Sequence, residues 1–203
     1  MRPFLGKPLI THSIQYAKDC DAVTGVFVST DDEEIGVISK AAGAEIIQRP
    51  DEISGDAATT ESAIEHALSH WDKRGLKPDI IVLLQATSPV RPEGSLAEAL
   101  SNFQKQKLDS MLSLSPTHRF FWKLEGNQAL AEYDFLNRPR RQDMRSADIR
   151  HVENGSVYIF TRKHFQSTGN RLGGQIGYVL FPEEYGLEID TELDFSLLES
   201  LHQ

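Results

Sequence analysis

Two carboxylates near the C-terminal end of the chain, Glu188 and Asp190, have a spacing that suits a divalent cation. They flank Ile189, so in an extended chain both side chains point to the same side. Two hard oxygen ligands beside a phosphate, with water and substrate completing the shell, are a usual way to hold Mg²⁺. Acids ahead of a helix are also ordinary complements to its dipole, and Thr191 with Asp194 forms a capping pattern for such a helix. Both explanations are open from these residues alone.

A second polar group directly follows the most apolar run of the chain. The run, residues 80–84, predicts a strand covered on both faces, as in a parallel sheet. Gln85, Thr87, Ser88 and Arg91 then lie at the carboxyl end of a central strand, where open α/β sheets bind ligands. An amide, two hydroxyls and a guanidinium can bind a base, a ribose and a phosphate. An ordinary loop with a serine cap for the next helix explains the same residues.

Other polar positions are candidates for binding a charged or hydroxylated ligand. Arg49 follows a short predicted strand and can pair with a phosphate or a carboxylate, although an arginine in this place is also commonly structural. Thr60 lies near the end of the polar loop 54–61, where helix capping equally explains a hydroxyl. Arg141 and Gln142 belong to a strongly basic segment, for which a solvated surface is the ordinary explanation.

Strands and helices alternate along the part of the chain that must position these residues. Buried apolar runs predict strands, and amphipathic segments between them predict helices. This alternation is the pattern of a doubly wound, Rossmann-like α/β sheet. The predicted strands are 23–28, 44–47, 80–84, 109–114 and 177–181, and helices are expected to begin near residues 8, 32, 61, 93 and 191, with no strand ahead of the first helix.

The composition of the sequence changes between residues 116 and 155. This stretch carries the basic segment and a group of aromatic residues, namely Phe120, Phe121, Trp122 and Phe135. A doubly wound sheet does not need such an excursion, and large exposed apolar patches usually find a partner. We therefore predict an arm of short strands, followed by an Asn-Gly turn at 154–155 and a further strand.

Composition limits the class of protein. With 203 residues, 39% of them apolar and 25% charged, the chain fits a single globular domain with the arm inserted at about 116–155. A net charge of −9 argues against a nucleic-acid partner. No apolar run approaches the roughly 20 residues of a membrane span, and no signal-peptide pattern is present. Because the lone Cys20 excludes an intramolecular disulfide, we expect a cytoplasmic protein.

The segment 83–92, LLQATSPVRP, resembles the LLQPTSPLR stretch of the acylneuraminate cytidylyltransferases. These enzymes activate sialic acids and related nonulosonic acids as CMP-sugars. The resemblance covers almost the whole chain, and its other segments are LGKPLI (5–10), VSTDDEEI (28–35), AGAEIIQRP (42–50), SGDAATTE (54–61), PRRQD (139–143), ENGSVYIF (153–160) and EIDTELDF (188–195).

The resemblance implies a nucleotidyltransferase that transfers CMP from CTP to a nine-carbon 2-keto sugar acid of the sialic, legionaminic or pseudaminic type, with release of pyrophosphate. It also implies a homodimer in which the arm of one subunit completes the site of its neighbour. Mg²⁺ would be held by Asp190 and Glu188, which are the catalytic residues of this reading. The implied nucleotide-binding residues are Gln85, Thr87, Ser88, Thr60 and Arg49, and the implied acid-binding residues are Gln85, Arg141, Gln142, Asn154 and Tyr158.

The sequence departs from the family pattern in two places. Glu188 stands where the family has an aspartate, so a changed distance to the metal is expected. In the family, a strand and a glycine-rich basic loop that holds the triphosphate come before the LGKPLI segment. We expect that loop to precede Met1 in the complete protein. The alternatives are an inactive nucleotide-binding or scaffold homologue, and a cytidylyltransferase for the eight-carbon sugar acid of lipopolysaccharide.

Overall fold

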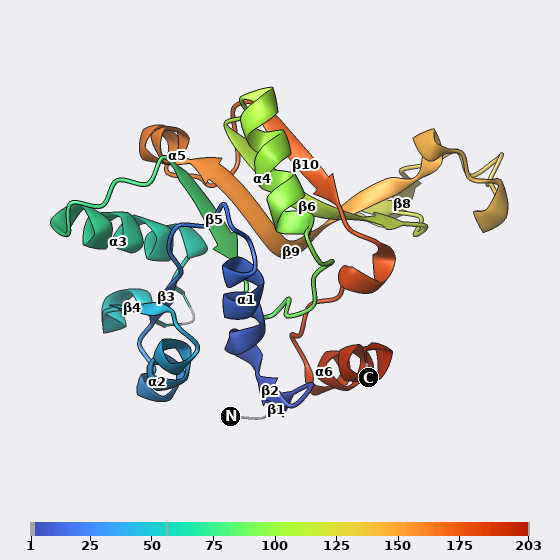
Figure 1. Ribbon diagram of the computed structural model, residues 1–203. Coiled ribbons are helices and arrows are strands. Elements are labelled where there is room, and N and C mark those ends of the chain that lie inside the picture. The colour runs from blue at the N-terminus through green and yellow to red at the C-terminus, as the bar shows by residue number, and fades with distance from the viewer. Residues whose placement is uncertain (1–2, 56, 203) are drawn as a thin grey trace.

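A mixed four-stranded sheet is the centre of the computed structural model, which describes residues 3–55 and 57–202. Its strand order is β10-β6-β9-β5, and a separate parallel pair, β3-β4, lies beside it (Figure 1). The strands are β5 (Ile80–Leu84), β6 (Ser110–Thr117), β9 (Arg150–Thr161) and β10 (Ile176–Leu180), with β3 (Phe27–Thr30) and β4 (Glu45–Gln48) in the separate pair. The α/β class expected from the sequence is confirmed.

The most deeply buried strand of the sheet is β9 rather than β5. Ile159 and Phe160 are fully buried on opposite faces of the sheet, whereas only Ile81 of β5 is buried. The predicted strand at 80–84 is covered on both faces as expected, since Ile80, Val82 and Leu84 pack into one core cluster and Ile81 and Leu83 into the other. Its predicted central place and parallel pairing are wrong. In the described part of the chain β5 pairs with β9 alone, and that pairing is antiparallel.

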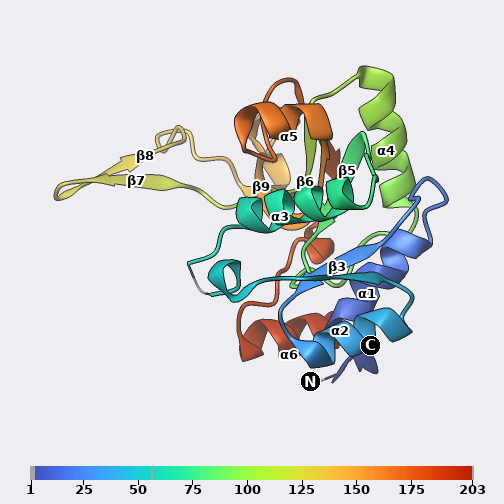
Figure 2. The same ribbon diagram turned by 90° about the vertical axis from the view of Figure 1, so that its left-hand side faces the viewer.

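Helices cover the two faces of the sheet (Figures 1 and 2). On one face Phe103 of α4 packs with Met111, and on the other Ile64 of α3 packs with Phe165 of α5. The helices are α1 (Leu9–Lys18), α2 (Glu33–Ala41), α3 (Thr60–Lys73), α4 (Ser95–Gln106), α5 (Arg162–Thr168) and α6 (Glu192–Leu201), and the short 3₁₀ turns are η1 (Asp51–Ile53), η2 (Arg141–Asp143), η3 (Ser146–Asp148) and η4 (Glu183–Tyr185). In the described residues no helix is long and apolar enough to cross a membrane.

Two predictions from local sequence patterns concern the two ends of the chain. The capping pattern at Thr191 and Asp194 is present in full at the start of α6, so that prediction is confirmed. The expectation of no strand before the first helix is wrong, since β1 (Pro3–Phe4) and β2 (Lys7–Pro8) form a two-residue hairpin. These strands are too short to produce a periodic signal in the sequence.

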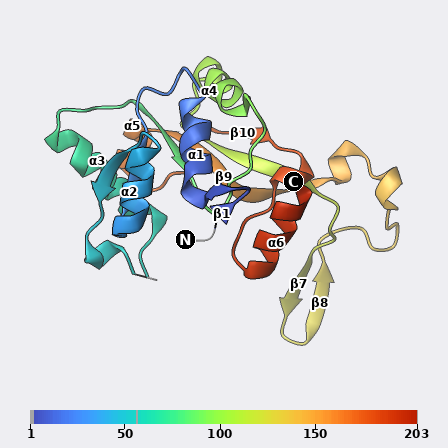
Figure 3. The same ribbon diagram turned by 60° about the horizontal axis from the view of Figure 1, so that its bottom comes forward.

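The predicted arm is a hairpin of β7 (Trp122–Glu125) and β8 (Gln128–Ala131) followed by η2 and η3, and it projects away from the sheet (Figures 2 and 3). It is shorter than expected, because Thr117 still pairs with Arg150 within the sheet. Trp122 and Phe135 are exposed, as are Leu136 at 81% and Leu124 at 76%, whereas Phe120 and Phe121 are half-buried.

Candidate active site

The carboxyl end of β5 meets the extended segment that precedes α6. The backbone N–H of Ile189 donates a hydrogen bond of 2.8 Å to the carbonyl oxygen of Thr87. This bond places Glu188 and Asp190, the two neighbours of Ile189, beside the polar loop that begins at Gln85. The sequence separated these two segments by about a hundred positions, and the fold brings them together.

Gly155 forms the floor between the two segments. It has a φ of +61°, and a Cβ atom at this position would overlap the carboxylate of Glu188 and lie 2.7 Å from Oε1 of Gln85. Only glycine permits both the backbone conformation and the close approach of these two side chains. Gln85 and Glu188 therefore converge directly above the backbone of β9.

A bulge in β9 creates this floor. Leu112 pairs with Tyr158 but Leu114 pairs with Glu153, so β9 has extra residues between two positions of β6. The buried amide of Asn154 holds the bulge, because it accepts a hydrogen bond from Ser113 Oγ (2.5 Å) and donates one to Ser115 Oγ (3.0 Å). The predicted Asn-Gly turn is thus wrong, since the strand continues through it. The predicted contact of Asn154 with the acid stays a prediction.

The electrostatics of the pair favour a bound cation. Burial raises the pKa of Glu188, and the nearby carboxylates of Asp190 and Glu153 raise it further. Two ionised carboxylates held close together repel each other, and a cation bound between them relieves this repulsion. In the described residues no group of three or more histidine, cysteine, aspartate or glutamate side chains forms a metal site. The donor set is therefore two carboxylates with the amide oxygen of Gln85 nearby.

Arg91 supports the loop from below. Its guanidinium is 8% exposed and donates hydrogen bonds to the carbonyl oxygens of Gln85 (2.8 Å) and Ser156 (3.1 Å) and to Ser13 Oγ (3.0 Å). Burial lowers its pKa to about 10. These bonds hold the guanidinium inside the protein, which does not support the expectation that it binds a phosphate. It fixes the loop to the bulge, and the 1% exposed Ser88 does the same through the carbonyl of Asn154 (3.4 Å).

Tyr158 lies on β9, three residues beyond Gly155, and is almost completely buried. Its hydroxyl donates a hydrogen bond of 2.5 Å to Oε1 of Glu153. Burial and this hydrogen bond raise the pKa of Tyr158 to about 12. The guanidinium of Arg171 lies 4.5 Å from the centre of its ring. Sequence reasoning missed Arg171, because an isolated arginine in a loop after a helix carries no recognisable pattern.

The remaining predicted residues lie on separate elements. Arg49 donates a hydrogen bond of 2.6 Å to the carbonyl oxygen of Ser29 and so ties β4 to β3. Thr60 is the first residue of α3, while Thr59 caps that helix. Arg141 and Gln142 are exposed in η2 on the arm, where Arg141 contacts Glu183 at 3.2 Å. Their predicted roles in binding stay predictions.

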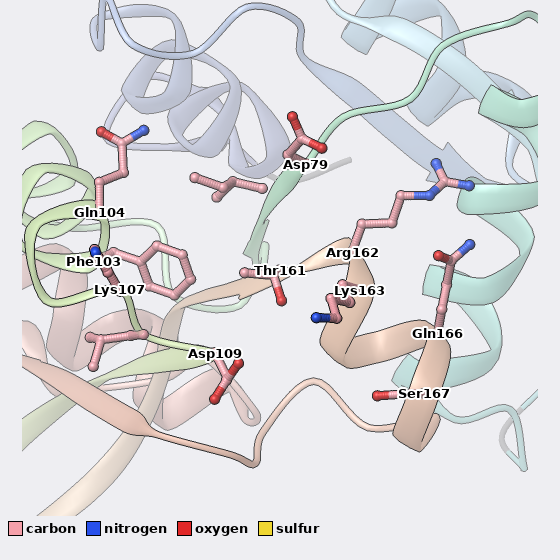
Figure 4. A pocket seen from close by; sticks show the side chains of 12 residues that line it. Asp79, Phe103, Gln104, Lys107, Asp109, Thr161, Arg162, Lys163, Gln166 and Ser167 are labelled. Atoms are coloured by element: carbon pink, nitrogen blue, oxygen red, sulfur yellow. The ribbon is translucent and has the colours of Figure 1, made fainter.

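A cavity of about 800 Å³ lies at the opposite end of β5 from Gln85. Figure 4 shows Lys163 and Ser167 of α5 facing Phe103 and Lys107 across it. None of the predicted site residues lines this cavity, and its carboxylates, Asp79 and Asp109, are not adjacent to the bulge. It is therefore separate from the candidate active site.

A family model described as cytidylyltransferase matches residues 1–203. N-acylneuraminate cytidylyltransferase A of Danio rerio is 35% identical over 199 residues, which is 96% of this chain and 44% of the relative. The N-acylneuraminate cytidylyltransferase of Escherichia coli O18:K1:H7 is 26% identical over 98% of this chain and 47% of its own length. The chain thus spans less than half the length of these curated relatives.

Solved structures show the same fold. CMP:2-keto-3-deoxy-manno-octonic acid synthetase, in complex with CTP, aligns with a TM-score of 0.69 at 16% identity over 98% of this chain and 89% of that chain. 4-Diphosphocytidyl-2C-methyl-D-erythritol synthase aligns with a TM-score of 0.68 at 13% identity over 98% of this chain and 92% of its own. At these identities the likeness extends to the fold alone.

Proposed function

The chain belongs to the cytidylyltransferase family, and on this premise we propose that it transfers CMP from CTP to a nine-carbon 2-keto sugar acid and releases pyrophosphate. The observation that carries the proposal is the hydrogen bond from Ile189 to Thr87, which sets two carboxylates against the polar loop after β5. The named relatives support an acylneuraminate-type acid over the eight-carbon acid, because the likeness to the eight-carbon enzyme is one of fold only.

In the proposed reaction a hydroxyl on the anomeric carbon of the acid attacks the α-phosphorus of CTP in line. The new oxygen–phosphorus bond forms as the bond to pyrophosphate breaks, and the hydroxyl proton is lost to solvent. Gln85 and Thr87 would position the nucleotide and the acid. Arg91 holds the backbone carbonyl of Gln85, and the amide of Asn154 fixes the neighbouring bulge to Ser115 of β6. Because reactants held in line lose little further entropy on reacting, this positioning supplies much of the rate.

The donor set at the site fits Mg²⁺. Hard carboxylate oxygens are its preferred ligands, and Asp190 lies close enough for its charge to raise the pKa of Glu188. When bound, Mg²⁺ would neutralise the phosphates and lower the pKa of a hydroxyl beside it. The extra methylene of Glu188 is accommodated because Gly155 leaves room for its carboxylate.

A homodimer is part of the proposal. The hairpin β7-β8 exposes Trp122 (50%) and Leu124 (76%), which is more apolar surface than an isolated arm would favour. In such a dimer the arm would present Arg141 and Gln142 to the acid bound by the neighbouring subunit. A cytoplasmic location is also proposed, on the sequence observation that the chain has one cysteine, Cys20, and so no internal disulfide.

The direct test is to incubate the protein with CTP, Mg²⁺ and single sugar acids and to measure pyrophosphate release. We expect release with a nine-carbon acid and not with the eight-carbon acid. Asp190→Asn should lower the rate at least a hundredfold, since it removes a charged ligand, while Glu184→Gln on the exposed turn η4 should not. Equal rates for Asp190→Asn and the unaltered protein would overturn the assignment.

A further inference from the structure

Arg171 lies in a loop that is built rigidly against the sheet. After α5, the N–H of Gly173 donates to Ser110 Oγ (3.0 Å), and Ser110 Oγ donates back to the carbonyl of Gly173 (2.8 Å). The N–H of Gln175 donates to the carboxylate of Asp109 (2.8 Å). The loop is thus fastened at two points, and its arginine is held in place before any ligand arrives.

The Arg171 side chain joins two elements of the candidate site. Its guanidinium stacks on the ring of Tyr158 of β9 at 4.5 Å and forms an ion pair with Glu61, in the first turn of α3. The side chains of Arg171 and Glu61 are only 21% and 28% exposed, so solvent screens this pair less than an ordinary surface pair. A planar guanidinium suits both contacts at once, which an ammonium group would not.

From Tyr158 a hydrogen bond continues to a second residue of β9. The hydroxyl of Tyr158 donates to Oε1 of Glu153 at 2.5 Å.

We propose that Arg171 is a positioning residue for the acid-binding side of the active site, because it fixes the ring of Tyr158 and thereby the direction of the hydroxyl that Tyr158 donates to Glu153. This inference rests on the proposed function. The first turn of α3 has its own cap, in which Thr59 accepts the N–H of Ser62. Loss of Arg171 therefore disturbs Tyr158 more than the loop that precedes α3.

The kinetic test separates the two substrates. Arg171→Ala should raise KM for the acid at least tenfold and change KM for CTP less than twofold, with kcat within about threefold. For Arg171→Lys, KM for the acid should lie between the values of the unaltered protein and of Arg171→Ala, because a lysine keeps the positive charge near Glu61 but cannot stack a planar group on Tyr158. Arg74→Ala is the matched control, since Arg74 also pairs with a glutamate, Glu45, beside an aromatic ring, and should change nothing.

A double-mutant cycle tests whether Arg171 acts through the hydroxyl of Tyr158. The combination of Arg171→Ala with Tyr158→Phe should raise KM for the acid no more than the larger single effect, because both variants break one chain of contacts. Multiplication of the two single effects would mean that Arg171 acts independently, and the proposal would be overturned.

A spectroscopic readout needs no turnover. In protein labelled with ¹³C at tyrosine Cζ, the signal missing from Tyr158→Phe belongs to Tyr158, and Arg171→Ala should shift it while Arg74→Ala should not. An unmoved signal overturns the role of Arg171 even if CMP transfer is observed. If the signal moves but no acid is converted by the unaltered protein, the proposed function fails and the control of Tyr158 by Arg171 stands.

Discussion

At the scale of single residues, Gly155 connects backbone conformation to chemistry. Its positive φ and the absence of a side chain let Gln85 and Glu188 approach each other above β9. A residue with a side chain would have to displace one of the two oxygen groups that the proposed site uses. The site therefore depends on the missing side chain of Gly155 as much as on the oxygen groups of Gln85 and Glu188.

Gly155→Ala should lower both activity and stability. The left-handed conformation costs an alanine about 1 kcal/mol, and its methyl group would overlap Glu188, so we expect about 2 kcal/mol lower unfolding free energy in urea and a loss of CMP transfer. Gly126→Ala is the control, because Gly126 has the same φ of +61° with no atom within 4 Å. Gly126→Ala should lose only the part of the unfolding free energy that comes from the left-handed conformation, and it should keep its activity. Equal losses of unfolding free energy in the two variants would contradict the proposed overlap at Gly155.

Tyr158 should make stability depend on alkaline pH. Its pKa is raised from 10 to about 12 in the folded protein by burial and by Glu153. The folded state thus holds the proton more tightly, so this contribution is present below pH 10 and is lost as the pH rises from about 10 to 12. Urea unfolding at about pH 9 and pH 11 should show a steeper decline for the unaltered protein than for Tyr158→Phe, and parallel declines would disprove the shift.

At the scale of elements, the loop after β5 and the bulge of β9 form one unit. Arg91 joins them through the carbonyl oxygens of Gln85 and Ser156, and the Ser113–Asn154–Ser115 hydrogen bonds fix the bulge to β6. The buried guanidinium of Arg91 also donates to Ser13 Oγ and lies over the ring of Tyr16. Another charged side chain could not take its place unless these surroundings rearranged. The geometry of the site is thus set by hydrogen bonds between elements.

Arg91→Met should destabilise the protein by about 2–4 kcal/mol, because it leaves buried carbonyl oxygens without donors. Thermal or urea unfolding measures the loss. Arg150→Met, at an arginine whose side chain is 52% exposed, should cost less than about 1 kcal/mol. If the two variants were equally stable, Arg91 would not hold the loop and the bulge together.

At the scale of the whole molecule, the arm and the sheet have different roles. The sheet buries its apolar residues between α4 on one side and α3 with α5 on the other, whereas the hairpin β7-β8 leaves Trp122 and Leu124 exposed. An exposed hairpin of this kind is stabilised when a second surface covers it. The proposed shared site gives this surface a function.

Complementation tests the shared site. Arg141→Ala removes an arm residue and Asp190→Asn removes a sheet-side carboxylate, so each variant alone should be inactive toward the acid. A mixture that exchanges subunits should recover roughly a quarter of the normal activity, because half of the dimers then contain one intact site of two. Light scattering should report a dimer throughout. No recovery from an exchanged mixture of dimers would show that Arg141 serves its own subunit.

The sequence by itself determined the α/β class, most helix positions, the cap of α6 and the two polar segments that carry the proposed chemistry. These features are local, since periodicity, capping and turn residues act over a few positions. Glu188 and Asp190 were found because their spacing of two places both carboxylates on one side of an extended chain.

Only the tertiary structure decided which strand is central, that Asn154 and Gly155 form a bulge rather than a turn, and that Arg91 lies beneath the loop rather than facing a ligand. It also brought Arg171 to Tyr158. Each of these depends on contacts between residues that are distant in the chain, such as Ser113 with Asn154 and Thr87 with Ile189. The free energy of such contacts exists only once the sheet has formed, so no short stretch of sequence can encode it.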